Sequence, residues 1–218
     1  DKLQIQLERM KNAGAKWAFS NAVCFGGDAS RPEGLNYPTS WKPPVPCFPA
    51  LLTGEGTPNL TNIVHRDLLM QLVPNRDLGA LLLDTEKFKG VDDWALTLQL
   101  SLLSEPDYCP EPLALYRDHS GGLSKRARAS FEARLAVIDL MREQGASEEL
   151  CRQAESLQRS KFAFDRLFAG EGGWRKDALQ SCLQPPVSLR DAYLASLTIL
   201  PSSLARLFYR MGLALKRR

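Results

Sequence analysis

The sequence predicts a mixed α/β chain that ends in an all-helical extension. Two short runs of residues have the apolar pattern of strands, and helical runs and Gly- and Pro-rich stretches separate them. From about Ser124 onward, apolar residues recur only at helical spacing. We therefore expect two parts: residues 1–125, which mix strands and helices, and residues 126–218, which form the helical extension.

Composition excludes several classes of protein. Of the 218 residues, 44% are hydrophobic and 24% charged, so the chain can bury a sizeable core and is not disordered. No window of about 18 residues is apolar enough to predict a membrane span. The net charge of +3 does not indicate nucleic acid as a partner. Two histidines cannot form a multi-histidine metal cluster.

The cysteines favour neither a zinc ribbon nor a disulfide framework. They are odd in number, widely spaced and without a CxxC pair. We expect reduced thiols and a cytoplasmic location. The five are Cys24, Cys47, Cys109, Cys151 and Cys182.

The first predicted element is a helix over residues 1–13. Leu3, Leu7 and Met10 lie on one of its faces at helical spacing. Gly14 can end the helix, because glycine readily adopts the left-handed conformation of a helix C-cap.

A strand and a long loop follow this helix. Residues 16–25 alternate well enough for a strand that directs Trp17, Phe19 and Val23 to one side. Residues 26–58 are rich in Gly and Pro, which excludes a long helix there. A loop of this length is usually functional, often as a lid over a site.

Two helices and a second strand complete the first part. Residues 64–73 predict a short helix that ends before Pro74, and residues 91–105 predict a longer one that Pro106 stops. Residues 112–119 read as an apolar strand that runs into a polar turn. The second part is predicted to contain helices within residues 125–145, 148–170, 173–183, 189–201 and 201–218.

Two groups of residues in the first part could carry chemistry. The first group opens the predicted helix and consists of Asp92, Asp93 and Trp94. The second follows roughly twenty residues later and consists of Glu111, Pro112, Leu113, Tyr116, Arg117, His119 and Ser124. Their order and spacing resemble the C-terminal part of the catalytic domain of family 2 glycosyltransferases, which have the GT-A fold. In that family an acidic pair and an aromatic residue open a helix, and an E-P-L-x-x-Y-R-x-H segment comes next.

Three further stretches resemble the same family. Residues 1–11 resemble the helix after the metal-binding DxD motif, residues 19–30 the next strand and turn, and residues 59–73 the acceptor-side stretch before the acidic pair. The resemblance covers residues 1–125 and implies a partial GT-A domain without its N-terminal nucleotide-binding half. Since the sequence opens with Asp1, we expect a fragment that begins shortly after the DxD motif.

The resemblance implies transfer of a sugar, with inversion, from a nucleotide-sugar donor to a glycan or lipid-linked glycan acceptor. An acceptor hydroxyl has a pKa far above 7, so a carboxylate must take its proton as the new bond forms. By the resemblance this base is Asp93, and Asp92 orients it or binds acceptor hydroxyls. The leaving diphosphate needs a divalent metal, Mn or Mg, in the full-length enzyme. The resemblance implies that His119 adds to the metal or diphosphate site and that Arg117 serves the diphosphate as a fixed cation.

Simpler interpretations exist for the same residues. Asp92 and Asp93 can be charges that favour the positive end of the helix dipole. Trp94 can be a core residue instead of a sugar platform. His119 can be an ordinary turn histidine, and Arg117 can pair with a local carboxylate. The residues assigned to the acceptor side are Trp94, Asn62 and Asp28, and the favoured simpler interpretation of Asp28 is a turn residue.

Residues 201–218 predict a basic amphipathic helix. Its apolar stripe consists of Leu204, Leu207, Phe208, Met211 and Leu215, and its basic residues are Arg206, Arg210, Lys216, Arg217 and Arg218. Such a helix can lie on an anionic membrane surface, here the inner face of the cytoplasmic membrane, or it can pack against its own domain. A rival function is therefore a non-catalytic helical interaction or membrane-docking module on a GT-like scaffold. The sequence that precedes Asp1 in the gene would discriminate between the two functions.

Overall fold

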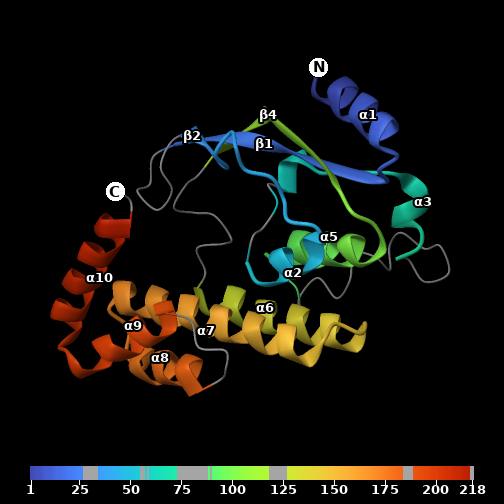
Figure 1. Ribbon diagram of the computed structural model, residues 1–218. Coiled ribbons are helices and arrows are strands. Elements are labelled where there is room, and N and C mark those ends of the chain that lie inside the picture. The colour runs from blue at the N-terminus through green and yellow to red at the C-terminus, as the bar shows by residue number, and fades with distance from the viewer. Residues whose placement is uncertain are drawn as a thin grey trace. The chain divides into compact units, whose positions relative to one another are not determined.

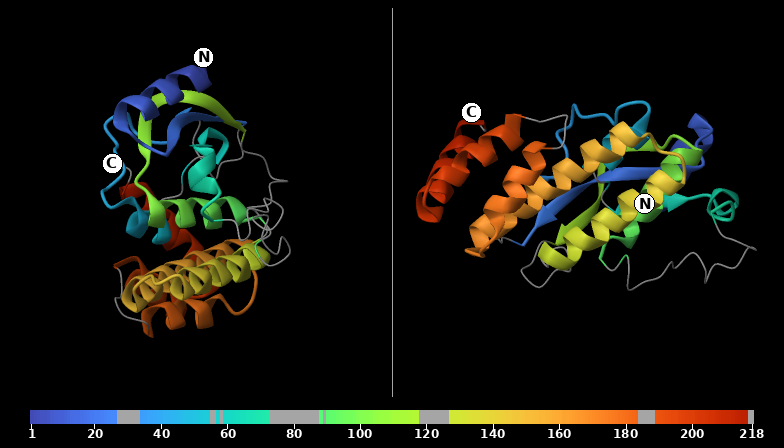
Figure 2. Two further views of the ribbon diagram at one scale, coloured as in Figure 1. Left: turned by 90° about the vertical axis from the view of Figure 1, so that its right-hand side faces the viewer. Right: turned by 90° about the horizontal axis from the view of Figure 1, so that it is seen from below.

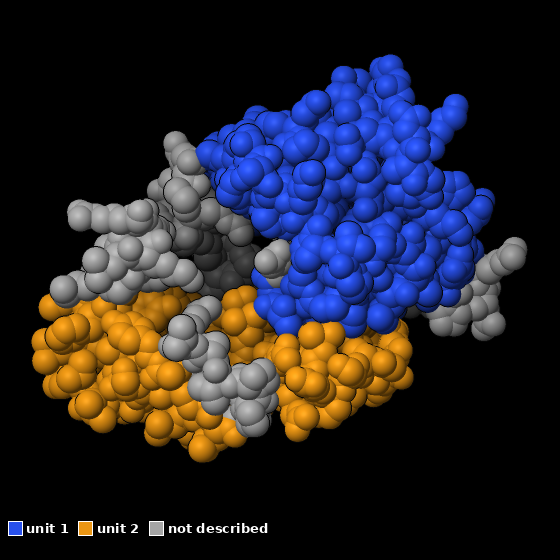
Figure 3. Space-filling view, viewed as in Figure 1, with its two compact units in different colours: residues 1–126 blue, residues 127–218 orange. Residues whose placement is uncertain are grey.

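The chain is a mixed α/β protein that divides into two compact units. The computed structural model describes residues 1–26, 34–54, 57, 59–72, 88, 90–117, 127–183 and 189–216. Unit 1 comprises residues 1–126 and unit 2 residues 127–218, coloured blue and orange in Figure 3. The division falls beside residue 125, where the sequence pattern changes. We describe each unit by itself.

Unit 1 is built around a small mixed sheet with β1 at its centre (Figure 1). β1 (Trp17–Phe25) pairs in parallel with β4 (Asp107–Arg117) over nearly its whole length. The short strands β2 (Gly34–Leu35) and β3 (Ile63–Val64) pair antiparallel with opposite ends of β1. Because a strand has only two edges and β4 occupies one of them, β2 and β3 share the other.

The predicted strand is β1, and it is buried on both faces. Residues 17–22 are all buried, with Trp17 and Phe19 on one face and Ala18 and Ala22 on the other. Figures 1 and 2 show the reason: helix α1 covers one face of the sheet, and helices α2 and α5 cover the other. A strand enclosed in this way reads as a continuous apolar run.

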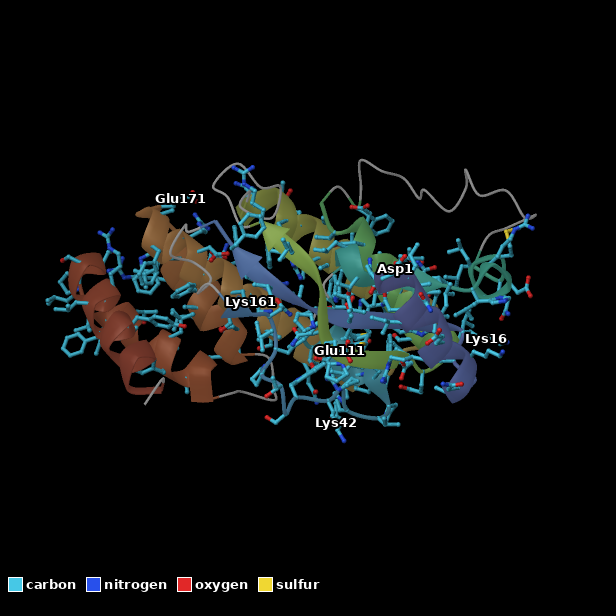
Figure 4. All side chains as sticks on the ribbon, turned by 90° about the horizontal axis from the view of Figure 1, so that it is seen from above. Asp1, Lys16, Lys42, Glu111, Lys161 and Glu171 are labelled. Atoms are coloured by element: carbon cyan, nitrogen blue, oxygen red, sulfur yellow. The ribbon has the colours of Figure 1, made fainter. Side chains whose placement is uncertain are left out.

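Helix α1 (Lys2–Ala13) begins and ends as the sequence predicts. The Asp1 carboxylate caps it by accepting the N–H of Leu3 at 3.0 Å, and Gly14 ends it with φ 65°. Asp1 and Lys16, on either side of the helix, are labelled in Figure 4.

The buried face of α1 is not the predicted one. Leu3 and Leu7 are 56% and 54% exposed, and the buried residues are Gln6 and Met10. The helix is turned in this way because Gln6 donates from Nε2 to the Thr61 carbonyl at 2.8 Å. This bond satisfies the Nε2 group of the buried Gln6 side chain, which would otherwise cost about 1–3 kcal/mol.

An ion pair joins α1 to β4. Arg9 donates to both carboxylate oxygens of Asp107, each at 2.9 Å, and to the Tyr108 carbonyl at 2.9 Å. The hydrogen bond to Asp107 raises the pKa of Arg9 above its ordinary value. Asp107 is only 14% exposed, so this bidentate pair is better shielded from solvent than an ordinary surface pair.

β4 begins earlier than the sequence predicts, at Asp107 instead of Pro112. Its pairing with β1 slips at Asn21, which is opposite Pro112 although the preceding Ser20 is opposite Cys109. Two residues, Pro110 and Glu111, are therefore inserted as a bulge. Proline cannot donate a ladder hydrogen bond, which explains why the irregularity falls here.

The remaining elements of unit 1 are helical. They are α2 (Cys47–Leu52), the 3-10 turn η1 (Asn59–Thr61), α3 (Arg66–Leu69) and α5 (Asp92–Leu103). α3 is shorter than the helix predicted over residues 64–73. On α5, Trp94 and Leu98 are buried, whereas Leu102 of the predicted stripe is 38% exposed.

Unit 2 consists of helices in the part that the structure describes. They are α6 (Ala127–Glu143), α7 (Glu148–Ala169), α8 (Trp174–Leu183), α9 (Leu189–Ser196), the 3-10 turn η4 (Leu197–Ile199) and α10 (Ser202–Lys216). α6 and α7 lie side by side (Figure 2). The rings of Phe131 and Phe162 stack with centroids 4.3 Å apart, and Arg142 pairs with the α7 carboxylates of Glu148 and Glu155.

The core of unit 2 lies where α7, α8, α9 and α10 meet. Ala163 and Leu167 of α7 pack there against Trp174, which is 2% exposed. α10 contributes Ala205 and Tyr209. The last helix therefore belongs to the folded unit and is not an appended tail.

We predict that replacing Arg9 with Ala lowers the free energy of unfolding by about 1–3 kcal/mol, because Asp107 would remain shielded from solvent without its cation. Urea denaturation measures this change. The control is Glu8→Ala on the same helix, which removes an exposed hydrogen bond from the Gln4 side chain. It should change the free energy by less than about 0.5 kcal/mol. Equal effects of the two substitutions would contradict the prediction.

Candidate functional site

Asp92 and Asp93 occupy the first turn of α5, as the sequence predicts. Asp92 is exposed, whereas Asp93 is half-buried and accepts the Trp94 N–H through Oδ1 at 2.7 Å. Val91 at the N-cap makes no side-chain hydrogen bond to the helix, and the acidic residues of the first turn are Asp92 and Asp93.

The structure brings Asn62 to the same place as Asp93. Asn62 Nδ2 lies 3.4 Å from Thr97 Oγ1, and Thr97 Oγ1 donates to the Asp93 carbonyl at 2.8 Å. Asn62 Nδ2 also lies 3.4 Å from Thr57 Oγ1. We call Asp93, Asn62 and Thr97 the α5 corner. Two residues that the sequence assigned separately to the base and to the acceptor side thus belong to one polar group.

Sequence reasoning missed Thr97. The signal was its spacing: residues four apart on a helix share a face, and a threonine hydroxyl commonly bonds the carbonyl four residues before it. Thr97 is one of three buried polar residues of α5, with Gln99 and Ser101. A polar residue there needs a partner, and Asn62 supplies one.

Hydrogen bonds to β1 and α1 fix the position of Asn62. Thr61 Oγ1 accepts the Ser20 N–H at 3.1 Å and donates to the Ser20 carbonyl at 3.0 Å. Gln6 and Lys2 donate to the carbonyls of Thr61 and Leu60, at 2.8 and 2.7 Å. The residues just before Asn62 are therefore held by four hydrogen bonds to β1 and α1, which give the α5 corner a rigid support.

Trp94 is a core residue, which corrects its assignment to the acceptor side. It is 7% exposed, and its indole N–H donates to the Leu51 carbonyl of α2 at 2.9 Å. A sugar platform needs an exposed ring face, and this ring has none to offer. Its contribution is to fix α5 against α2, as Trp17 fixes the other end of α5 by donating to the Ser104 carbonyl at 2.7 Å.

Arg117 lies away from the α5 corner. It is exposed at the end of β4, where it pairs with Phe25, whereas Ile63, next to Asn62, pairs with Ala18. Seven residues of β1 separate those two positions, or about 23 Å at 3.3 Å per residue. The structure therefore does not bring Arg117 together with Asn62. His119 and Asp28 lie outside the described residues.

Part of the loop predicted as a lid is fixed to the sheet. Asn21 donates from Nδ2 to the Tyr37 carbonyl at 2.9 Å and accepts the Tyr37 N–H at 3.0 Å. Tyr37 stacks on Trp41 with centroids 3.9 Å apart, and Trp41 meets Tyr108 edge-on at 4.9 Å. Over residues 34–54 the chain is thus held on β1, and it includes β2 and α2.

The described residues do not by themselves form a metal site. No three His, Cys, Asp or Glu side chains among them are placed to hold an ion. Asp93 already binds the N–H of its own helix through one carboxylate oxygen. The expected divalent metal therefore does not fit the described part of this chain alone, and we derive no step through it.

The five cysteines are thiols, and four of them are buried. Burial raises the pKa of the Cys109 thiol and of the Cys151 thiol. Since the thiolate is the reactive form, these two residues are not activated nucleophiles.

Comparison of the chain with protein-family models, curated proteins and solved structures finds no match. The glycosyltransferase hypothesis therefore rests on the quoted motifs and on the α5 corner. Within the described helices, none combines the length and the apolar character needed to cross a bilayer.

We predict that Thr97→Val lowers the free energy of unfolding by about 1–2 kcal/mol, because the Asn62 amide loses a hydroxyl partner in a buried setting. Thr97→Ser is the matched control, since it keeps the hydroxyl and removes only a methyl group. Urea denaturation of both variants measures the difference. If valine were tolerated as well as serine, the contact between Asn62 and Thr97 would not hold the corner together.

Proposed function

We propose that this chain is the acceptor-side part of an inverting glycosyltransferase, with Asp93 as the general base. The observation that supports the proposal is the α5 corner, where Asp93 is half-buried at a helix N-terminus and Asn62 is joined to the Asp93 backbone carbonyl through the hydroxyl of Thr97. The motif resemblance assigns Asp93 to the base and Asn62 to the acceptor side. The backbone N–H of Trp94 binds Asp93, whereas the Trp94 side chain lies in the core and Arg117 lies at the other end of β1.

The chemistry required of Asp93 is simple. As the acceptor oxygen attacks the anomeric carbon, its proton must pass to a base. A carboxylate offers about four lone-pair sites, so Asp93 can accept a hydroxyl in addition to the Trp94 N–H that binds its Oδ1. That same bond orients the carboxylate. Asn62, whose amide both donates and accepts, suits the binding of neighbouring sugar hydroxyls.

The donor is a nucleotide sugar and the acceptor a glycan or lipid-linked glycan. A divalent metal, Mn or Mg, would neutralise the charge of the leaving diphosphate when bound. No DxD motif occurs in this sequence, so we assign the metal and most donor contacts to residues outside it. The corresponding location is the cytoplasm, where nucleotide sugars are made available. Nucleic acid is not a proposed partner.

We predict that Asp93→Asn lowers turnover by roughly 10²–10⁴-fold, the usual contribution of a general base. The assay uses the complete gene product, Mn or Mg, and a panel of nucleotide sugars. Asp92→Asn is the control for charge at the same helix end, and it should lower turnover by less than about tenfold. Circular dichroism verifies that both variants fold.

Two results would overturn this assignment. Near-normal turnover of Asp93→Asn would remove Asp93 as the base. Failure of the unsubstituted gene product to transfer any donor sugar in the panel to glycan or lipid-linked acceptors would remove the proposed function.

We also predict that residues 1–218 alone bind nucleoside diphosphates only weakly, with a Kd above about 1 μM, or −8 kcal/mol. The reason is that the proposed base and metal contacts lie outside this sequence. Calorimetric titration with several diphosphates and Mn measures the affinity. Tighter binding would show that the donor site lies within these residues.

A further inference from the structure

Helix α10 has two different apolar faces. On one face, Ala205 and Tyr209 are buried in the core of unit 2, where the Tyr209 ring lies 4.4 Å from that of Phe164. The backbone carbonyl of Phe208 accepts the hydroxyl of Tyr193 at 2.9 Å, which also holds α10 on α9. These contacts fix the orientation of α10 within unit 2.

The second face is exposed. Leu204, Leu207 and Phe208 are 43%, 52% and 45% exposed, although all three are large and apolar. They follow the i, i+3, i+4 spacing of a single stripe, and Met211 and Leu215 continue that spacing in the sequence. The stripe is therefore exposed although another face of the same helix packs on unit 2.

The charged residues along the sequence of this helix have one sign. Residues 192–218 contain no acidic residue and five basic ones, which are Arg206, Arg210, Lys216, Arg217 and Arg218. Arg206 directly precedes Leu207 and Phe208, and its Nε donates to the Ser202 carbonyl, within the helix. An occupant of the stripe must therefore be apolar where it meets the leucines and anionic beside them.

We propose that the exposed stripe of α10 docks on an anionic membrane surface, with the helix lying in the plane of the interface. Leucine and phenylalanine enter the boundary between headgroups and acyl chains, and the basic side chains meet lipid phosphates. This inference rests on α10 and not on the proposed sugar transfer.

Other occupants fit the stripe less well. A second copy would place two identical sets of five cations at one interface, where they repel each other. Nucleic acid would bind the cations but would leave the large apolar side chains in water. A lipid surface satisfies both requirements at once.

The test uses the complete chain and vesicles of phosphatidylcholine, with and without phosphatidylglycerol. Deletion of residues 201–218 is unsuitable, because it would remove Ala205 and Tyr209 from the core. The test variant is instead Leu207→Gln with Phe208→Gln. The matched control is Leu3→Gln with Leu7→Gln, which changes two leucines of similar exposure on helix α1.

We expect the chain to sediment with the anionic vesicles and not with the neutral ones. The α10 variant should lower the partition coefficient at least about tenfold, and the α1 control should change it less than about twofold. Raising the salt concentration from about 0.1 to 0.5 M should weaken binding, because salt screens the cations. Circular dichroism and sedimentation velocity verify that both variants fold and report their association state.

Three results would overturn the proposal. The first is equal sedimentation of the unsubstituted chain and the α10 variant. The second is equal binding to neutral and anionic vesicles. The third is the absence of vesicle binding together with a dimer that the α10 variant dissociates, which would assign the stripe to a second copy.

Discussion

The burial of β1 on both faces is the constraint on which the rest of unit 1 depends. A strand that is enclosed in this way has no water to satisfy its polar groups, so each of them needs a partner from the protein. Ser20 finds that partner in the side chain of Thr61, and Asn21 finds it in the backbone of Tyr37. The segments that contain Thr61 and Tyr37 are thereby fixed on the sheet.

The α5 corner follows from this constraint. Thr61 is bound to β1, so the next residue, Asn62, has a fixed position, and Thr97 binds it to the first turn of α5. The other end of α5 is held by Trp17, a residue of the same strand. A carboxylate on α5 is thus positioned by contacts that serve to satisfy buried polar groups. This is the kind of rigid support that a catalytic group requires.

The two amphipathic helices at the ends of the chain differ in what they leave exposed. α1 buries a face that contains Gln6 and Met10, and it leaves Leu3 and Leu7 in water. α10 buries Ala205 and Tyr209 and leaves a longer apolar stripe beside basic residues. In both helices, specific contacts with neighbouring elements determine which face is packed. Of the two, only α10 combines large exposed apolar side chains with charged residues of a single sign.

The sequence by itself determined the features that depend on neighbours along the chain. The end of α1 at Gly14, the acidic first turn of α5, the strand at residues 16–25 and the helical second part were all predicted correctly, because caps, dipoles and periodicity act over one or two turns. Only the tertiary structure decided which groups meet through space. It placed Trp94 in the core, joined Asn62 to the first turn of α5 through Thr97 and separated Arg117 from Asn62, because burial and sheet register depend on segments that are distant in the sequence.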